Sequence, residues 1–133
     1  MFETQTNVKL HDTDAAGVVF FANYFRIAHT AFEAFMKSVG CGVDYMVRTA
    51  DFLILIVHAE ADYKRPFLLG DTVSISVEAT GAGTSSFALT YLIRDADGDV
   101  CVTVRTAHVA VDKKTGEKIP LPEKVRNGIQ SIS

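Results

Sequence analysis

The sequence predicts an α+β fold in which one long helix packs on one face of a five-stranded antiparallel sheet. Only one segment, from about residue 23 to 39, shows the three- and four-residue spacing of apolar side chains that is typical of an amphipathic helix. The other apolar segments are strand-sized, and four of them follow one another with short turns between them. A helix followed by hairpin-connected strands favours α+β over an alternating α/β fold.

The length and composition are those of one soluble globular domain over residues 1–133, with 48% hydrophobic and 22% charged residues. The net charge of −3 and the lack of a long basic run argue against a nucleic-acid partner. No apolar run reaches the ~18 residues of a membrane span, and the N-terminus lacks signal-peptide features. Cys41 and Cys101 stand alone. We therefore expect a cytoplasmic protein with reduced thiols, no metal and no membrane contact.

The first half of the chain is expected to contain a strand, an acidic turn and the long helix. Alternation in residues 2–10 indicates the strand. The helix begins near Asn23, a candidate N-cap, and runs for about 16–18 residues. Gly40 and Gly42 end it, because glycine accepts the left-handed C-cap conformation. Residues 43–51 form a loop or a short second helix.

Four further strands are expected over residues 52–65, 72–80, 86–94 and 100–111. Asp97-Gly98 is the strongest hairpin signal between them. A short helix is expected over residues 122–129. Apolar side chains of both parities occur in the strands that carry Ile75, Val77, Leu89, Tyr91, Val102 and Val104. We therefore expect the second face of the sheet to carry apolar surface that a partner subunit covers.

The most specific motif is the turn before the helix, Asp12-Thr13-Asp14-Ala15-Ala16-Gly17-Val18-Val19-Phe20-Phe21-Ala22-Asn23-Tyr24. With the order of the elements, it resembles the hotdog-fold acyl-CoA thioesterases of the 4-hydroxybenzoyl-CoA thioesterase type over nearly the whole chain. Together with His58-Ala59-Glu60-Ala61-Asp62-Tyr63, it is most similar to the 1,4-dihydroxy-2-naphthoyl-CoA hydrolases of menaquinone and phylloquinone biosynthesis. Thioesterases of the Tol-Pal system share the first motif but usually lack the histidine and acids of the second.

The resemblance implies a hotdog fold, in which a five-stranded antiparallel sheet wraps the long helix. It also implies a homodimer with a continuous sheet, or a homotetramer, with active sites at the subunit interface. The expected activity is hydrolysis of an aromatic acyl-CoA thioester. No cofactor is expected, since coenzyme A is part of the substrate.

Three catalytic assignments follow from the turn. Asp14 matches the second aspartate of the motif and is expected to act as nucleophile or general base, although residue types alone leave a turn-capping role equally open. Asp12 is expected to form the turn. The resemblance assigns the polarising hydrogen-bond donor to the backbone N–H of Phe21, near the positive end of the helix dipole. Gly17 allows either close approach of a ligand or an unusual φ.

Five residues are candidates for substrate binding. Phe20 and Tyr24 would line an aromatic pocket, or belong to the core. His58 would bind a substrate hydroxyl, or be a satisfied interface histidine. Lys64 and Arg65 would bind the CoA phosphates, or be solvated charges. His29 and Glu33, four residues apart, share a face of the helix; either that face covers the acyl pocket, or the two residues form a surface pair, which is the favoured interpretation.

Two other functions stay open. One is a thioesterase for short- or medium-chain aliphatic acyl-CoA or acyl-carrier-protein substrates, and the other is a noncatalytic acyl-CoA binding module. The sequence contains neither a Gly-x-Ser-x-Gly nucleophile elbow nor a glycine-rich phosphate loop. Hotdog-fold dehydratases carry a histidine where this chain has its acidic turn, so dehydration is disfavoured.

Overall fold

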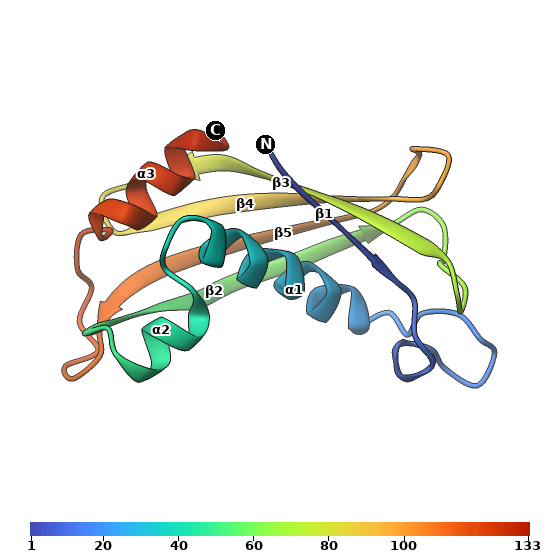
Figure 1. Ribbon diagram of the computed structural model, residues 1–133, viewed down its shortest axis with the longest axis horizontal. Helices are drawn as coiled ribbons and strands as arrows, with labels where there is room; N and C mark the ends of the chain where they lie inside the picture. The colour runs from blue at the N-terminus through green and yellow to red at the C-terminus, as the bar shows by residue number, and fades with distance from the viewer.

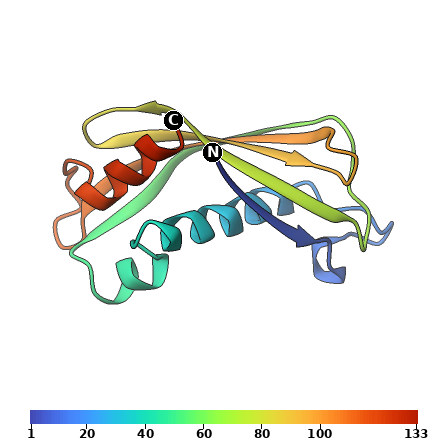
Figure 2. The same ribbon diagram turned by 45° about the horizontal axis from the view of Figure 1, so that its top comes forward.

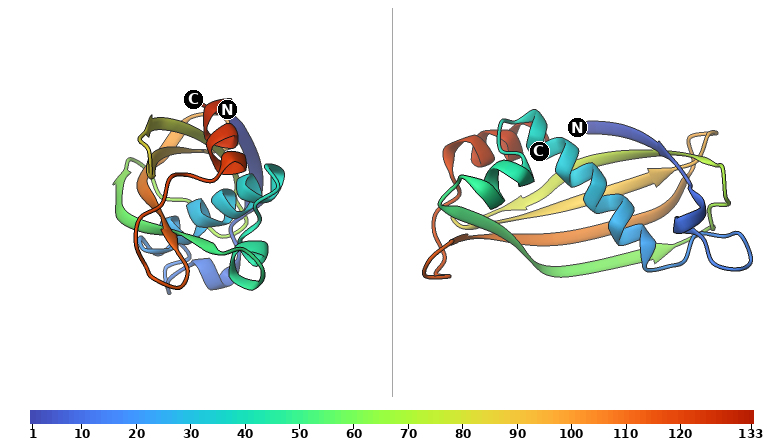
Figure 3. Two further views of the ribbon diagram at one scale, coloured as in Figure 1. Left: turned by 90° about the vertical axis from the view of Figure 1, so that its left-hand side faces the viewer. Right: turned by 60° about the horizontal axis from the view of Figure 1, so that its bottom comes forward.

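The computed structural model describes all residues 1–133 and contains one five-stranded antiparallel sheet with three helices. The strands are β1 (Phe2–Asn7), β2 (Phe52–Tyr63), β3 (Thr72–Ala82), β4 (Ser86–Arg94) and β5 (Val100–Asp112). The helices are α1 (Asn23–Ser38), α2 (Val43–Arg48) and α3 (Glu123–Ser131). The strand order is β1-β3-β4-β5-β2, and the sheet curves around α1 (Figures 1 and 3). This arrangement confirms the predicted α+β class with a long helix wrapped by the sheet.

Helix α1 forms because its apolar residues fall on one stripe, which is buried against the concave face of the sheet. The buried members of this stripe are Tyr24, Ile27, Ala28, Ala31, Phe32, Phe35 and Met36. The helix ends as predicted, with Gly40 in the left-handed region at φ +83°. The predicted N-cap is wrong, because the Asn23 side chain accepts no first-turn N–H and instead donates to the Asp12 carbonyl.

Strands β3, β4 and β5 place alternate side chains on the helix side of the sheet. All six apolar residues named as evidence for a second apolar face are buried on that side: Ile75, Val77, Leu89, Tyr91, Val102 and Val104. The opposite face of these strands carries mainly hydroxyl and charged residues, among them Ser76, Thr90, Arg94, Thr103 and Arg105. The prediction of an apolar second face is therefore wrong.

Exposed apolar surface lies instead on β2, which is an edge strand. Leu55, Ile56 and Val57 are 44%, 47% and 63% exposed. A bulge between Ile56 and His58 shifts the register against β5, so that the two halves of β2 are out of phase. After the bulge Ala59 faces the helix side, opposite Thr106, and His58 faces the outer side.

The remaining elements close the ends of the molecule. The C-terminal helix α3 packs near β3, where the Ala79 N–H donates to the Ile132 carbonyl (Figure 2). Strand β1 is shorter than predicted, because residues Leu10–Asp12 turn into a 3₁₀ helix. None of the helices combines the length and the apolarity that crossing a membrane would require.

Candidate active site

Asp12 is the structural acid of the turn before α1. Only 3% of its surface is exposed; its carboxylate pairs with Arg26 and accepts the Lys9 N–H over 2.9 Å. Its carbonyl accepts the Phe20 N–H at 3.0 Å and the Asn23 side-chain amide at 2.9 Å. These bonds tie the two limbs of the turn to each other and to the start of the helix, which is the role expected of Asp12.

Asp14 is the exposed acid of the same turn. Its carboxylate makes no ion pair, and one oxygen accepts the Ala16 N–H at 2.8 Å. Its backbone N–H donates to the Val18 carbonyl across the turn at 2.9 Å. Gly17 has φ +79°, and a Cβ added there would meet no atom within 4 Å. Glycine is therefore favoured by the backbone conformation of the turn that presents Asp14 to solvent, and no other part of the chain crowds this position.

The backbone N–H of Phe21 is a free donor on the other limb of the turn. No acceptor in the chain bonds to it, whereas the neighbouring Phe20 and Asn23 N–H groups are both bonded. Phe21 lies just before α1, where the helix dipole favours negative charge. The turn therefore presents an exposed carboxylate without an ion pair on one limb and an N–H donor without an acceptor on the other.

Four of the predicted site residues line one cleft of about 210 Å³, although they come from two segments some forty positions apart in the sequence. These are Phe21 and Tyr24 from the turn and α1, and Lys64 and Arg65 from the segment after β2. The Tyr63 hydroxyl donates to the Phe21 carbonyl at 3.3 Å and closes the cleft on one side. The Lys64 ammonium forms no ion pair, so a cation with no partner borders this cleft.

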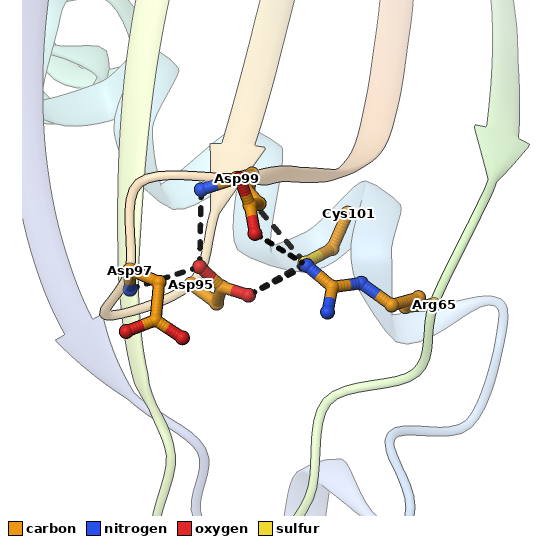
Figure 4. Close-up of polar contacts among 5 residues, drawn as sticks. All are labelled: Arg65, Asp95, Asp97, Asp99 and Cys101. Atoms are coloured by element: carbon orange, nitrogen blue, oxygen red, sulfur yellow. Dashed lines mark hydrogen bonds and ion pairs between the residues drawn. The ribbon is translucent and has the colours of Figure 1, made fainter.

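Arg65 is already engaged within the chain. Its guanidinium donates to Asp95 at 2.8 Å and to Asp99 at 3.2 Å, and it lies 3.7 Å from the sulfur of Cys101 (Figure 4). These contacts connect the segment after β2 to the β4–β5 connection. Arg65 therefore has a structural role on this face, and Lys64 is the cation of the pair that is free for a ligand.

The two predicted aromatic residues differ in their surroundings. Tyr24 is buried, its hydroxyl accepts the Phe67 N–H at 3.1 Å, and burial raises its pKa. It therefore anchors the start of α1 to the segment after β2 while its ring borders the cleft. Phe20 is exposed and packs on Phe21, with ring centroids 4.8 Å apart.

His58 does not join the other site residues within one chain. It lies on the outer face of the sheet, opposite Ala107, and its Nε2 is 3.2 Å from Glu60. Neighbouring Asp62 on the same face pairs with Arg105 at 2.9 Å. The alternation predicted for this half of β2 is present, and it directs His58 away from α1.

A second, smaller cavity of about 80 Å³ lies beneath α1 beside the β2 edge. Its lining includes Thr106, which was not predicted as a site residue, and Tyr91, which was predicted only as an apolar strand residue. It also contains His29, which stacks on Phe32 at 5.4 Å and forms no ion pair with Glu33, so the predicted surface pair is wrong. The sequence contains one indication of this cavity in β5, where the polar residues Thr106 and His108 stand at positions that the alternation assigns to the buried face.

The structure contains no group of three or more His, Cys, Asp or Glu side chains arranged to hold a metal ion. Cys41 and Cys101 are both free and buried. Burial raises the pKa of each thiol, and Asp95 raises that of Cys101 further. Neither cysteine is therefore an activated thiolate.

Residues 8–129 match the family model of the thioesterase-like superfamily. The chain belongs to this superfamily. It is also 35% identical over 130 residues to the 1,4-dihydroxy-2-naphthoyl-CoA hydrolase of Synechococcus elongatus, covering 97% of this chain and 95% of that protein.

Solved structures agree with this assignment and confirm the hotdog fold. The 1,4-dihydroxy-2-naphthoyl-CoA thioesterase from Synechocystis superimposes with a TM-score of 0.91 at 29% identity, over 98% of this chain and 96% of that one. A gentisyl-coenzyme A thioesterase gives a TM-score of 0.86 at 26% identity, over 96% and 99% of the two chains. The resemblance read from the turn motif is thereby confirmed at the level of the family.

Proposed function

We propose that this protein is an aromatic acyl-CoA thioesterase whose substrate is 1,4-dihydroxy-2-naphthoyl-CoA, an intermediate of quinone biosynthesis. The observation that carries the proposal is the 35% identity to a hydrolase of that name over 97% of the chain. Two solved relatives whose names also specify aromatic acyl-CoA thioesters support it. Residues 1–133 would act as one domain in the cytoplasm, where Cys41 and Cys101 stay reduced.

Asp14 is the proposed catalytic group. Its carboxylate is exposed and carries no ion pair, so it is available either to attack the thioester carbonyl or to take a proton from an attacking water. Water supplies the new oxygen in both routes, and the products are the free acid and the CoA thiol. Gly17 contributes through the turn conformation that exposes Asp14.

The Phe21 N–H is the proposed donor to the thioester oxygen. It has no acceptor in the free protein, and charge on the oxygen increases as the tetrahedral intermediate forms. A donor of this kind contributes roughly 3–4 kcal/mol to transition-state stabilisation. Because the donor is a backbone group, its side chain can change without removing it.

The CoA portion would follow the cleft bordered by Phe21, Tyr24 and Lys64. Lys64 would neutralise a phosphate, with Arg65 contributing only if it leaves its two aspartates. Phe20, exposed beside Phe21, would cover the bound thioester. His58 would take part only through a second subunit, because it lies on the outer face of its own sheet.

A second copy of the chain is the proposed partner of β2, as a homodimer or as a homotetramer built from two such dimers. A 12-residue edge strand with exposed Leu55, Ile56 and Val57 presents unpaired backbone groups together with apolar surface. Such edges are normally paired or covered. The cavity beneath α1 opens beside this edge, since Ile56 and Ala59 are among its lining residues. A partner on β2 would therefore also enclose the acyl group.

A panel of CoA esters tests the proposed function. Purified protein is expected to hydrolyse 1,4-dihydroxy-2-naphthoyl-CoA and other aryl-CoA esters with kcat/KM at least 100-fold above hexanoyl-CoA and decanoyl-CoA. Preference for the aliphatic esters would favour the alternative thioesterase. Binding of the esters without any turnover would favour the noncatalytic binding module.

The proposed dimer is tested by a pair of substitutions at equally exposed valines. Val57→Lys puts a charge on the β2 edge, and Val47→Lys puts one on α2; both parent side chains are 63% exposed. We expect light scattering to give a monomer with little activity for Val57→Lys and parental mass and activity for Val47→Lys. An active monomeric Val57→Lys variant would contradict a site completed by a second chain.

A further inference from the structure

The cavity beneath α1 exists because small side chains face each other across it. Ala28 on α1 and Ala59 on β2 leave space that larger residues would fill. Phe25 and Ile56 supply its apolar walls, and Thr106 supplies a hydroxyl. The volume of about 80 Å³ is below the roughly 150 Å³ of a cavity that binds benzene. It can therefore accept the edge of an aromatic ring, with the rest of the ring lying toward the open β2 edge.

A buried polar chain ends at this cavity. His108 is stacked between Phe32 and Phe87, with ring centroids 4.8 and 4.7 Å away and nearly parallel planes. Its Nε2 is 2.7 Å from the Thr106 hydroxyl, and its Nδ1 has no partner. The Tyr91 phenol is also buried, and it lines the same cavity as Thr106 without a hydrogen bond to another group of the chain.

The polar hydrogen atoms of His108, Thr106 and Tyr91 outnumber the hydrogen bonds that these three side chains can make to one another. A buried N–H without a partner costs more than a bare ring-nitrogen lone pair, so Nε2 carries the proton of the neutral imidazole and donates to Thr106. Thr106 and Tyr91 each hold one hydroxyl hydrogen, and only one of the two can be given to the other hydroxyl. One O–H donor is left without an acceptor in the protein, at the wall of the cavity.

We propose that the Thr106 and Tyr91 hydroxyls bind a ring hydroxyl of the aromatic acyl group, and that His108 is the positioning residue that orients Thr106. This inference rests on the proposed function, and it makes the cavity beneath α1 the part of the site that selects hydroxylated acyl groups. The leftover O–H donates to the oxygen of the ring hydroxyl. The ring hydroxyl can in turn donate to the neighbouring hydroxyl oxygen or to the imidazole of His29, which also faces the cavity.

The position of the cavity fits this role. Its helical residues, Phe25 to His29, lie four to eight positions beyond Phe21, which is roughly 6–12 Å along the helix axis at 1.5 Å per residue. The near end of that range is within reach of a ring hydroxyl on an aromatic acyl group whose thioester carbonyl is held at the Phe21 N–H. A fully apolar acyl group would leave the O–H unpaired, so the cavity favours the hydroxylated ester over the deoxy ester.

The test compares kcat/KM for two substrate pairs: 1,4-dihydroxy-2-naphthoyl-CoA against 2-naphthoyl-CoA, and 4-hydroxybenzoyl-CoA against benzoyl-CoA. For each pair, the ratio is kcat/KM for the hydroxylated ester divided by kcat/KM for the ester without hydroxyls. This ratio does not depend on the folded fraction of a variant, so a poorly folding variant is still informative. Thr106→Val and Tyr91→Phe are each expected to lower the ratio roughly 10-fold, as expected for one buried hydrogen bond. Thr106→Ser should retain the ratio.

Two matched variants separate recognition from structure. Thr103→Val removes a hydroxyl from the outer face of the same strand and should leave the ratio unchanged. His108→Phe keeps the aromatic stack but removes the donor to Thr106, and it should lower the ratio about threefold.

Two results would overturn the inference. If the parent hydrolyses both members of each pair and Thr106→Val has the parental ratio, the hydroxyl site is wrong while the thioesterase function stands. If the parent hydrolyses none of the aryl esters, the proposed function fails, and the inference fails with it.

Discussion

The turn before α1 and the cavity beneath α1 differ in the environment of their polar groups, which are exposed in the turn and buried at the cavity. In the turn, the Asp14 carboxylate is exposed and makes no ion pair, and the Phe21 N–H has no acceptor in the chain. At the wall of the cavity, Thr106 is buried and hydrogen-bonded to the buried His108, which is stacked between two aromatic rings. The exposed groups are suited to a reaction that consumes water, whereas the buried ones are suited to recognition, because burial makes each unmatched hydrogen bond costly.

The comparison also applies within the turn itself. Asp12 and Asp14 are two residues apart, yet Asp12 is buried against Arg26 and Asp14 faces solvent. The same residue type therefore builds the site in one place and is available to react in the other. Substitutions that break one region and leave the other intact can test this separation.

The largest effect is expected for Asp14→Asn, which removes the proposed nucleophile or base while keeping the side-chain shape. Hydrolysis of 1,4-dihydroxy-2-naphthoyl-CoA should fall by about 1,000-fold, within the range for loss of a positioned base. Thermal unfolding should match the parent, because Asp14 is exposed and makes no ion pair, and an asparagine oxygen can still accept the Ala16 N–H. Asp12→Asn is the matched control and should instead lower the free energy of unfolding by about 1–3 kcal/mol. Stable, fully active Asp14→Asn protein would refute the assignment.

The next effect concerns the buried imidazole and pH. Burial, with His29 adding to it, lowers the pKa of His108 from 6.5 to about 4 in the folded chain. As pH falls from 6.5 to 4, the unfolded chain binds a proton that the folded chain does not, so stability is lost in that window and is constant above it. The loss should reach roughly 3 kcal/mol.

Urea titrations of the parent and of His108→Phe at pH 7, 5.5 and 4 measure this dependence. The parent should lose stability relative to the variant as the pH falls. Equal losses in both proteins would mean that His108 does not control acid stability.

The smallest effect is expected for Lys64→Ala at the cleft. Loss of one partly solvated cation should raise KM for CoA esters about 3- to 10-fold and leave kcat unchanged. The difference from the parent should shrink at high salt. Lys114→Ala, at the exposed turn after β5, is the control and should behave as the parent. A parental KM for Lys64→Ala would remove Lys64 from the proposed CoA path.

Most of the fold could be predicted from the sequence because each element carries its own periodicity and stop signal. Strand β4 and the 16-residue length of α1 agree with the prediction, and the hotdog fold is confirmed. The Asn23 cap and the apolar second face were wrong for tertiary reasons. Asn23 serves the turn, and the bulge near Val57 moves the exposed apolar surface to the β2 edge.

The site was predictable only where a motif marks it. The turn identified Asp14, Gly17 and Phe21, whose catalytic roles stay predictions, and the structure joins Phe21 with Tyr24, Lys64 and Arg65 in one cleft. Sequence alone did not reveal that Arg65 is held by Asp95 and Asp99.

The polar lining of the cavity beneath α1 could not be predicted, because it depends on packing between elements. Thr106 and His108 become neighbours only in the folded strand, and the space beside them depends on Ala28 and Ala59 from two other elements. Alternation within one strand carries no information about such a space.

The proposed separation between catalysis at the turn and substrate recognition at the cavity is tested most directly by the substrate preference of the Asp14→Asn variant. Its residual kcat/KM for 1,4-dihydroxy-2-naphthoyl-CoA is divided by that for 2-naphthoyl-CoA and compared with the parent's ratio. We predict that both values fall by the same factor of about 1,000 and that the ratio is unchanged. A ratio that falls toward one would contradict the separate roles of the two regions, since Asp14 would then also bind the ring hydroxyl.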